Sequence, residues 1–375
     1  MDLAFLRPLY ESAGMVASVY LDTSQTTTGP DVEALQIRWR DQRAGLAKVL
    51  DETATLDALG RVLTGPAALG APGMAAFGLD GSVPLAVRLP ATPRQARARW
   101  GRLPDLLPLL VQAPPRPPHL LVSATKEGGD VLVVGGAGAG KAVQGTGWPV
   151  HRTKTGGWSQ ARYQRSAEEA WETNAKELAD AVAKAAGGRP VEAVIVAGDV
   201  RARELLVARL AADLARKAVI VDRELTAGSG ELAQAAEQVL GQLEDDDCRN
   251  RLESFGSQAG TGRAVEGLPE TVAALRDGEV AELFLGGDYL SGDRDVPGPP
   301  WADAPAYAGP GLAEIGLTAD ELRERLVTGI VPDRVDAALV RAAAGTDARL
   351  FIVPPGEAPL RDDIGALLRF AVPGA

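Results

Sequence analysis

The residue types best suited to chemistry lie together in one short stretch, residues 155–165. A glycine pair is followed there by an aromatic and two polar side chains: Gly156, Gly157, Trp158, Ser159 and Gln160. Because glycine has no Cβ, paired glycines let the backbone approach a ligand closely. A glutamine side chain both donates and accepts hydrogen bonds, so it could orient a water molecule or a carbonyl group. This stretch is therefore the first candidate for a functional site.

The same stretch is basic within an acidic chain. The whole sequence has 39 Lys and Arg against 50 Asp and Glu, a formal net charge of −11. Residues 149–166 contain no acid, and the cations around the glycine pair are Arg152, Lys154, Arg162 and Arg165. Clustered cations of this kind bind phosphates. We therefore predict a loop tip that enters an RNA-lined cavity, where Trp158 stacks on a base.

Composition excludes several other classes of chemistry. A single cysteine, Cys248, rules out an internal disulfide and fits a reducing cytoplasm. Two histidines, His119 and His151, leave almost no material for a zinc site or a Cys/His catalytic pair, so neither metal nor cofactor is expected. No apolar run approaches the roughly 18 residues that span a bilayer, and the N-terminus lacks a signal peptide. The acidic balance argues against indiscriminate nucleic-acid binding, and we expect a cytoplasmic protein with neither DNA nor a membrane as a partner.

A competing motif lies at Gly135–Lys141, GGAGAGK, which matches the first seven positions of a phosphate-binding P-loop. The eighth position is Ala142, where a hydroxyl group should hold magnesium. Glycines and Pro149 follow, and they disfavour the helix whose N-terminus would receive the phosphates. A flexible Gly/Ala loop is the favoured interpretation, and a nucleotide-dependent switch that uses Lys141 is kept as an alternative.

Two further features have an ordinary structural interpretation beside a functional one. The arginine run at 94–102, opposed by Asp105, could bind RNA but is interpreted as a solvated helix face. Asp199 follows a predicted strand and could be a catalytic carboxylate at the edge of a parallel sheet. A cap for the following helix is the favoured role.

Length and punctuation predict the domain organisation. A chain of 375 residues exceeds one ordinary core, so two or three domains are expected. The proline run at 114–118 is typical of a stiff spacer, and the glycine-rich stretch at 256–267 of a flexible one. We therefore predict a multidomain protein of α+β and α/β type, with an N-terminal α+β domain at 1–113, a middle domain at 119–256 and a C-terminal domain at 264–375.

Periodic patterns place helices and strands in all three segments. In the first, a strand is predicted at 16–22, helices at 31–50 and 55–63, and strands at 75–79 and 83–89. The middle has a hairpin of strands 120–124 and 131–135, a long helix after residue 160, a parallel βαβ unit with strands 191–198 and 218–222 around helix 199–215, and a helix at 230–255. The last has helices at 268–276, 319–326 and 333–344, strands at 280–286 and 348–353, a final helix or strand at 364–370, and an exposed Pro/Gly-rich insertion at 296–311.

The glycine pair, the glutamine, the arginines and the long helix that follows resemble the middle domain of archaeal–eukaryotic class-one peptide release factors. The resemblance implies an RNase H-like middle domain whose loop enters the peptidyl-transferase centre, where the glutamine helps water attack peptidyl-tRNA. Residues 264–285 and 364–370 are similar to the opening and closing residues of those factors' third domain, an α/β sandwich. The resemblance therefore covers residues 119–375.

The chain also departs from that pattern. Trp158 and Ser159 separate the glycines from Gln160, and Gly157-x-x-Gln160 is similar to the loop of hydrolases in eukaryotic ribosome quality control. The first segment does not resemble the stop-codon-reading domain, so codon-specific termination is not expected. The whole arrangement is most similar to bacterial members of this superfamily, which include a ribosome-hibernation factor that occupies the A site together with elongation factor Tu.

Two hypotheses follow from the resemblance. In the favoured one the protein is a ribosome-hibernation or stress factor, with its cations on 23S rRNA phosphates and residues 156–160 blocking the peptidyl-transferase centre. In the other it is a peptidyl-tRNA hydrolase, in which Gln160 positions water and the backbone near Gly157 stabilises the oxyanion.

Overall fold

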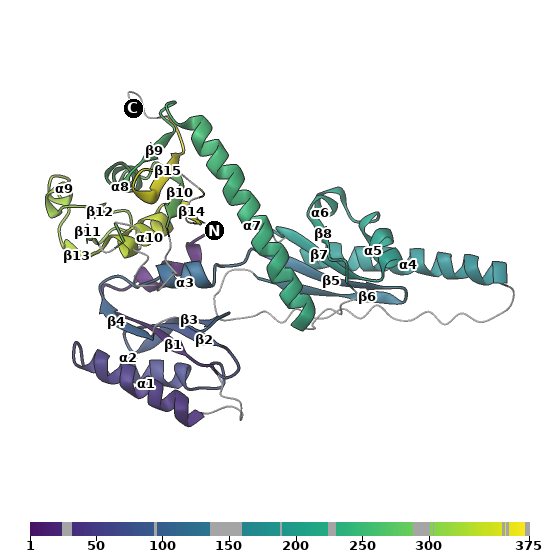
Figure 1. Cartoon of the computed structure of the whole chain (residues 1–375), viewed down its shortest axis with the longest axis horizontal. Helices are drawn as coiled ribbons and strands as arrows, with labels where there is room; N and C mark the ends of the chain where they lie inside the picture. Colours follow the sequence, from purple (N-terminus) through teal and green to yellow (C-terminus); the bar gives the residue numbers. More distant parts are fainter. Residues whose placement is uncertain are drawn as a thin grey trace. The chain divides into compact units, whose positions relative to one another are not determined.

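The computed structural model describes residues 1–24, 32–93, 96–135, 160–187, 190–223, 230–287, 301–302, 304–354, 357 and 360–371. The chain forms two compact units (Figure 1). Unit 1 comprises Met1–Pro115 and Cys248–Ala375, and unit 2 comprises Arg116–Ala137 and Lys141–Asp247. The predicted mixed α/β class with more than one unit is confirmed, whereas the three-domain boundaries stay a prediction.

Unit 2 is built on one four-stranded sheet with the strand order β6-β5-β7-β8. β5 and β6 form an antiparallel hairpin, while β5 pairs with β7, and β7 with β8, in parallel. The predicted hairpin and the predicted parallel pair are therefore confirmed. The strands are β5 (His119–Thr125), β6 (Gly128–Val134), β7 (Ala193–Gly198) and β8 (Ala218–Ile220).

Helices cover both faces of this sheet because its strands are apolar on both sides. Successive side chains of a strand point to opposite faces: Leu120 and Val122 pack with α4, α5 and α6, whereas Leu121 packs with α7. The single helix predicted at 199–215 is wrong, because a turn that brings Leu210 into the core separates α5 from α6. The helices are α4 (Gln160–Ala186), α5 (Val200–Val207), α6 (Ala212–Arg216) and α7 (Gly230–Gln258).

The first segment of unit 1 forms an antiparallel sheet with the order β3-β2-β1-β4. Asp80 and Gly81 form the two-residue turn that joins β2 to β3, and their φ angles are 46° and 75°. A two-residue hairpin turn needs positive φ angles because only then does its twist match that of the two strands. Helices α1 and α2 pack on one face of the sheet. The elements are β1 (Val16–Asp22), α1 (Val32–Ala47), α2 (Thr53–Leu63), β2 (Gly73–Leu79), β3 (Ser82–Leu89) and β4 (Arg97–Gly101).

The last segment of unit 1 has two sheets, with the orders β14-β10-β15-β9 and β12-β11-β13. The closing stretch, predicted as a helix or a strand, is the strand β15. The strands are β9 (Ala264–Glu266), β10 (Val280–Gly286), β11 (Pro305–Ala308), β12 (Ile315–Gly316), β13 (Val331–Arg334), β14 (Arg349–Val353) and β15 (Ile364–Leu368). The helices are α8 (Leu268–Arg276), α9 (Ala319–Arg323) and α10 (Val335–Gly345).

The two segments of unit 1 share one hydrophobic core. Every residue of α10 from Val335 to Ala344 is buried, as expected for a helix that is apolar nearly all round. Two elements of the first segment, η1 (Ala4–Tyr10) and α3 (Leu107–Gln112), contact α10 and contribute to the same core. The burial of α10 therefore depends on residues more than two hundred positions earlier in the chain.

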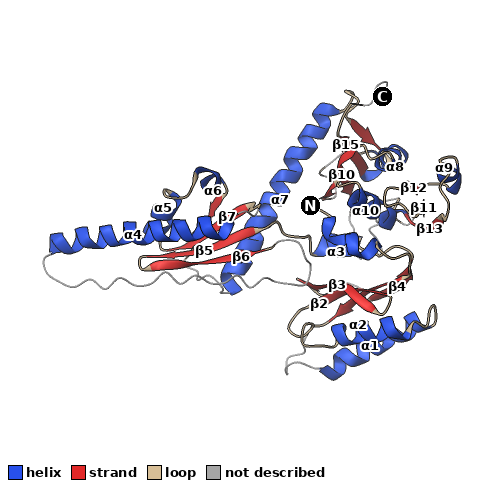
Figure 2. Cartoon of the chain, turned by 180° about the vertical axis from the view of Figure 1, so that it is seen from behind, coloured by secondary structure: helices blue, strands red, loops and turns tan. Residues whose placement is uncertain are grey.

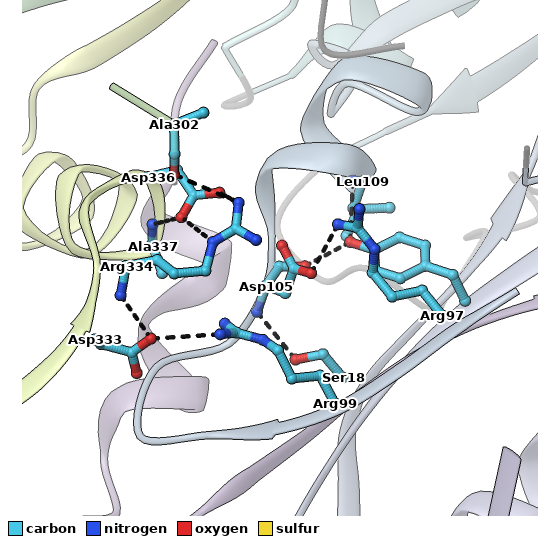
Figure 3. Close-up of polar contacts among 11 residues, drawn as sticks. Ser18, Arg97, Arg99, Asp105, Leu109, Ala302, Asp333, Arg334, Asp336 and Ala337 are labelled. Atoms are coloured by element: carbon cyan, nitrogen blue, oxygen red, sulfur yellow. Dashed lines mark hydrogen bonds and ion pairs between the residues drawn. The ribbon is translucent and has the colours of Figure 1, made fainter. Parts of the chain in front are cut away.

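Ion pairs and hydrogen bonds join the same two segments (Figure 3). Arg99 Nη1 lies 3.6 Å from Asp333 Oδ1, and the Leu103 amide donates to Asp333 Oδ2 at 2.8 Å. Within the first segment, Arg97 pairs with the buried carboxylate of Asp105 at 3.1 Å. The interpretation of this arginine run as a helix face is wrong: Arg97 and Arg99 lie in strand β4, and they form ion pairs with carboxylates of the same unit.

The expectation of an exposed insertion at 296–311 is also wrong for its described part. Pro305–Ala308 is β11, the central strand of the small sheet, and Trp301, Ala306 and Ala308 are buried. Proline is tolerated there because it is the first residue of the strand. Among the described residues, no helix has the length and apolar content to cross a membrane.

Candidate functional site

The predicted site lies at the N-terminal end of α4. Gln160 is the first residue of this helix, and Arg162 and Arg165 lie in its first two turns. The predicted long helix after the glycine pair is therefore confirmed. The remaining candidates fall outside the described residues: Arg152, Lys154, Gly156, Gly157, Trp158 and Ser159.

Helix α4 carries its first residue far from the core of unit 2. Its 27 residues correspond to a length of about 40 Å. In its second half, Leu178 and Val182 pack into the core and are fully or almost fully buried. Gln160 precedes the buried Asn174 by fourteen positions, about 21 Å of helix. In both views the first turns of α4 extend past the sheet (Figures 1 and 2).

A polar cluster fixes α4 to the sheet where the helix reaches it. The Lys126 ammonium, in the turn between β5 and β6, lies 5.3 Å from the centre of the Trp171 ring. The same ammonium is 3.3 Å from Asp199 Oδ2, and Asn174 Nδ2 donates to the Lys126 carbonyl at 2.9 Å. We call Lys126, Trp171, Asn174 and Asp199 the α4 anchor. It joins the helix, the hairpin turn and the start of α5, and so sets the direction in which α4 leaves the sheet.

Asp199 caps α5, as the sequence predicts. Its carboxylate accepts hydrogen bonds from the amides of Arg201 and Ala202, at 3.0 and 3.1 Å. Partial burial raises the pKa of Asp199, but the hydrogen bond from Ala202 and the contact with Lys126 outweigh it and lower the pKa below its usual range. A carboxylate held ionised in this way stabilises the helix and is poorly suited to act as a general base.

Within the ranges that the structure describes, the other features weighed in the sequence do not come together as a second site. Lys141 and most of the P-loop-like stretch fall outside the described residues. Asp222, which follows β8, accepts a hydrogen bond from Arg203 Nη2 at 2.7 Å. In the part of the chain that the structure describes, no three His, Cys, Asp or Glu side chains lie close enough to hold a metal ion.

Sequence reasoning missed the α4 anchor and a second polar contact, at the proline spacer. Trp171 lies in the long helix predicted after residue 160, and nothing in its neighbourhood signals a contact with Lys126, forty-five residues earlier. Arg116, within the spacer, pairs through Nε with Glu237 of α7 at 2.8 Å and through Nη1 with Glu244. In the sequence, this contact is indicated only by the presence of one arginine in the proline run at 114–118.

The Bacterial archaeo-eukaryotic release factor family 2 matches this chain over residues 118–261. Two Mycobacterium tuberculosis proteins, Rv2629 of strain H37Rv and MT2704 of strain CDC 1551, are each 31% identical to it over 381 residues. The alignment covers 98% of this chain and 96% of each of these proteins. The likeness therefore extends well beyond the middle segment.

Solved structures that this chain matches include an archaeal translation termination factor, which is 17% identical with a TM-score of 0.25 over 98% of this chain and 97% of that one. Archaeoglobus fulgidus Pelota is 14% identical, with a TM-score of 0.36 over 99% and 92% of the two chains. Archaeal Pelota in a ribosome-bound complex with ABCE1 is also 14% identical, with a TM-score of 0.37 over 99% and 94%.

Proposed function

Because this chain belongs to the bacterial archaeo-eukaryotic release factor family, we propose that it is a translation factor that binds the ribosomal A site. The observation that carries this proposal is the position of Gln160 at the first residue of α4, about 21 Å of helix before the buried Asn174. A long helix that carries a glycine-rich, basic tip is suited to enter a narrow cavity in the large subunit.

The tip has separate parts for affinity and for position. Phosphate contacts by cations supply most of the affinity for RNA, and in this proposal they come from Arg152, Lys154, Arg162 and Arg165. Trp158 stacks on a base of 23S rRNA, and Gly156 and Ser159 let the backbone follow the RNA closely. The α4 anchor fixes the direction of the tip, because its contacts hold α4 in one orientation on the sheet of unit 2.

Occlusion of the peptidyl-transferase centre is the favoured outcome of this binding, as in ribosome hibernation or another stress response. Two residues separate the glycine pair from Gln160, and one of them is the bulky Trp158. In a cytoplasmic role of this kind, elongation factor Tu is the partner we propose for delivery to the A site.

A second candidate function is peptidyl-tRNA hydrolysis, and the residue that favours it is Gln160. An amide at the first position of α4 could orient a water molecule towards the ester, while the amide near Gly157 donates to the oxyanion. This mechanism needs neither a metal ion nor a cofactor.

Release of labelled peptide separates the two functions. Ribosomes carrying labelled peptidyl-tRNA are incubated with the parent protein, with Gln160→Ala and with the matched control Gln164→Ala, which lies one turn further along α4. Tight binding without release by any of the three supports occlusion. Release by the parent and by Gln164→Ala, but not by Gln160→Ala, supports hydrolysis. If the parent does not sediment with ribosomes, both functions are wrong.

A further inference from the structure

A groove of about 290 Å³ lies in unit 1, at some distance along the chain from the loop tip. Its walls are the last turns of α7, the strand β9 and the residues just before β15. The floor is apolar, formed by Leu252, Phe255 and Leu360, of which Phe255 and Leu360 are buried. None of these residues belongs to the α4 anchor or to the tip, so the proposed function leaves the groove without a role.

The floor of the groove is rigid. The Phe255 ring packs edge-on against Phe284, with ring centres 5.6 Å apart, and Phe284 stacks on Phe351 at 5.3 Å. Phe284 is fully buried and Phe351 is almost so. A floor held by three packed aromatic rings is already formed before any partner arrives, which reduces the entropy lost on binding.

The rim of the groove is acidic. Among its described lining residues, Glu253, Glu266 and Glu357 are acids and Arg249 is a base. This excess of carboxylates disfavours the phosphates of RNA and favours a cation. The combination of an apolar floor and an acidic rim fits a lysine or arginine side chain together with an apolar neighbour, since such side chains bury their stems and leave the charge at the edge.

One lining residue of the groove is a glycine with open space beside it. Gly256 lines it from the last turns of α7, and a Cβ at this position would meet no atom within 4 Å. Packing inside the protein therefore does not require glycine there, although glycine weakens a helix relative to alanine. A side chain at position 256 would start at the wall of the groove, with no atom within 4 Å of its Cβ.

We propose that this groove docks a segment of a partner protein in which a lysine or arginine lies next to an apolar side chain. Its volume is just below the range of ordinary small-molecule pockets, and it suits one or two anchoring side chains of a protein partner. The groove lies in unit 1, whereas the tip lies in unit 2, so binding of this segment is a second interaction of the chain and does not depend on the ribosome-binding proposal.

The test uses three fluorescent eight-residue peptides, each with four leucines at the same positions. The other four residues are all lysine in the first peptide, all glutamine in the second and all glutamate in the third. Anisotropy is measured with the full chain. We expect the lysine peptide to bind most tightly and the glutamate peptide least, and Gly256→Trp to weaken the lysine peptide at least tenfold. Gly241→Trp is the matched control: Gly241 also lies in α7, a Cβ there meets no atom within 4 Å, and its variant should bind as the parent does.

Charge reversal provides an independent readout that does not rely on a bulky residue. The double variant Glu253→Lys, Glu266→Lys should reverse the order and prefer the glutamate peptide. The proposal is overturned if the lysine peptide does not bind at millimolar concentration, if Gly256→Trp binds it as tightly as Gly241→Trp does, or if the double variant keeps the parental order. It is also overturned if sedimentation shows a dimer that Gly256→Trp dissociates, because the occupant is then a second copy of this chain.

Discussion

The two units are assembled from the chain in different ways. Apart from α7, which contributes to both, unit 2 is a continuous stretch whose sheet is covered by helices adjacent to its strands in sequence. Unit 1 joins residues from both ends of the chain around α10. Unit 2, which has the candidate loop, is therefore stabilised mainly by contacts between elements that are close in sequence. Unit 1, which has the groove, depends on contacts between distant segments.

Deletion of residues 1–113 should have the largest effect, because it tests whether unit 1, unlike unit 2, depends on a distant segment of the chain. Without η1 and α3, the apolar surface of α10 is exposed, and unit 1 should lose cooperative unfolding and aggregate. Unit 2 keeps both of its cores and should keep its own transition. Circular dichroism and limited proteolysis check this result. Full protection of residues 264–371 in the truncated chain would show that the last segment folds alone.

Removal of Asp333 should lower the free energy of unfolding of unit 1 by about 1–3 kcal/mol, which is the usual cost of leaving a buried donor without an acceptor. Asp333→Ala removes an acceptor from Leu103 and the ion pair of Arg99. The matched control is Asp320→Ala, since Asp320 is 79% exposed and its pair with Arg323 should contribute less than about 1 kcal/mol. Urea unfolding measures both variants, and equal losses would show that the contact between the segments is unimportant.

Asp199→Ala tests the α4 anchor in unit 2. Loss of the α5 cap should cost about 1 kcal/mol, the typical value for an aspartate cap, and should also free Lys126 from its ion pair. Asp213→Ala is the control, because Asp213 is exposed in the first turn of α6 but caps no helix. Chemical denaturation checks the difference. We expect faster amide exchange in the first half of α4 only in Asp199→Ala, and unchanged exchange there would mean that the anchor does not position the helix.

The smallest expected effect is a pH dependence of unit 2 from His119. Burial lowers the pKa of His119 below its usual 6.5, although the hydrogen bond with the Pro117 carbonyl opposes this. The unfolded state therefore binds more protons, so the stabilisation is complete above pH 6.5 and decreases as the pH falls through the lower folded value. His119→Gln should remove this slope between pH 7.5 and 5.5 in thermal unfolding, and His151→Gln should keep it. A slope that survives in His119→Gln would assign the effect to other groups.

Local patterns predicted most of unit 2 and part of unit 1. The alternation of β5 and the spacing of apolar residues in α4 are properties of neighbouring residues, so both could be predicted from the sequence. The pairing of Arg99 with Asp333 could not, because it joins residues 234 positions apart. The strand β11 could not be predicted either, because its pairing with β12 and β13 is not visible in its own local sequence. For the candidate site, the position of Gln160 at a helix start was predicted, whereas the α4 anchor was not.

The salt dependence of ribosome binding tests the central claim most directly. Sedimentation with ribosomes over a series of salt concentrations compares the parent, Arg162→Gln with Arg165→Gln, and a control pair of exposed cations in unit 2, Arg216→Gln with Arg223→Gln. We predict weaker binding by the first double variant and a log–log slope smaller by about two, or one for each phosphate contact removed. The control pair should keep the parental slope. An unchanged slope in the α4 variant would contradict the claim that this end of the helix enters ribosomal RNA.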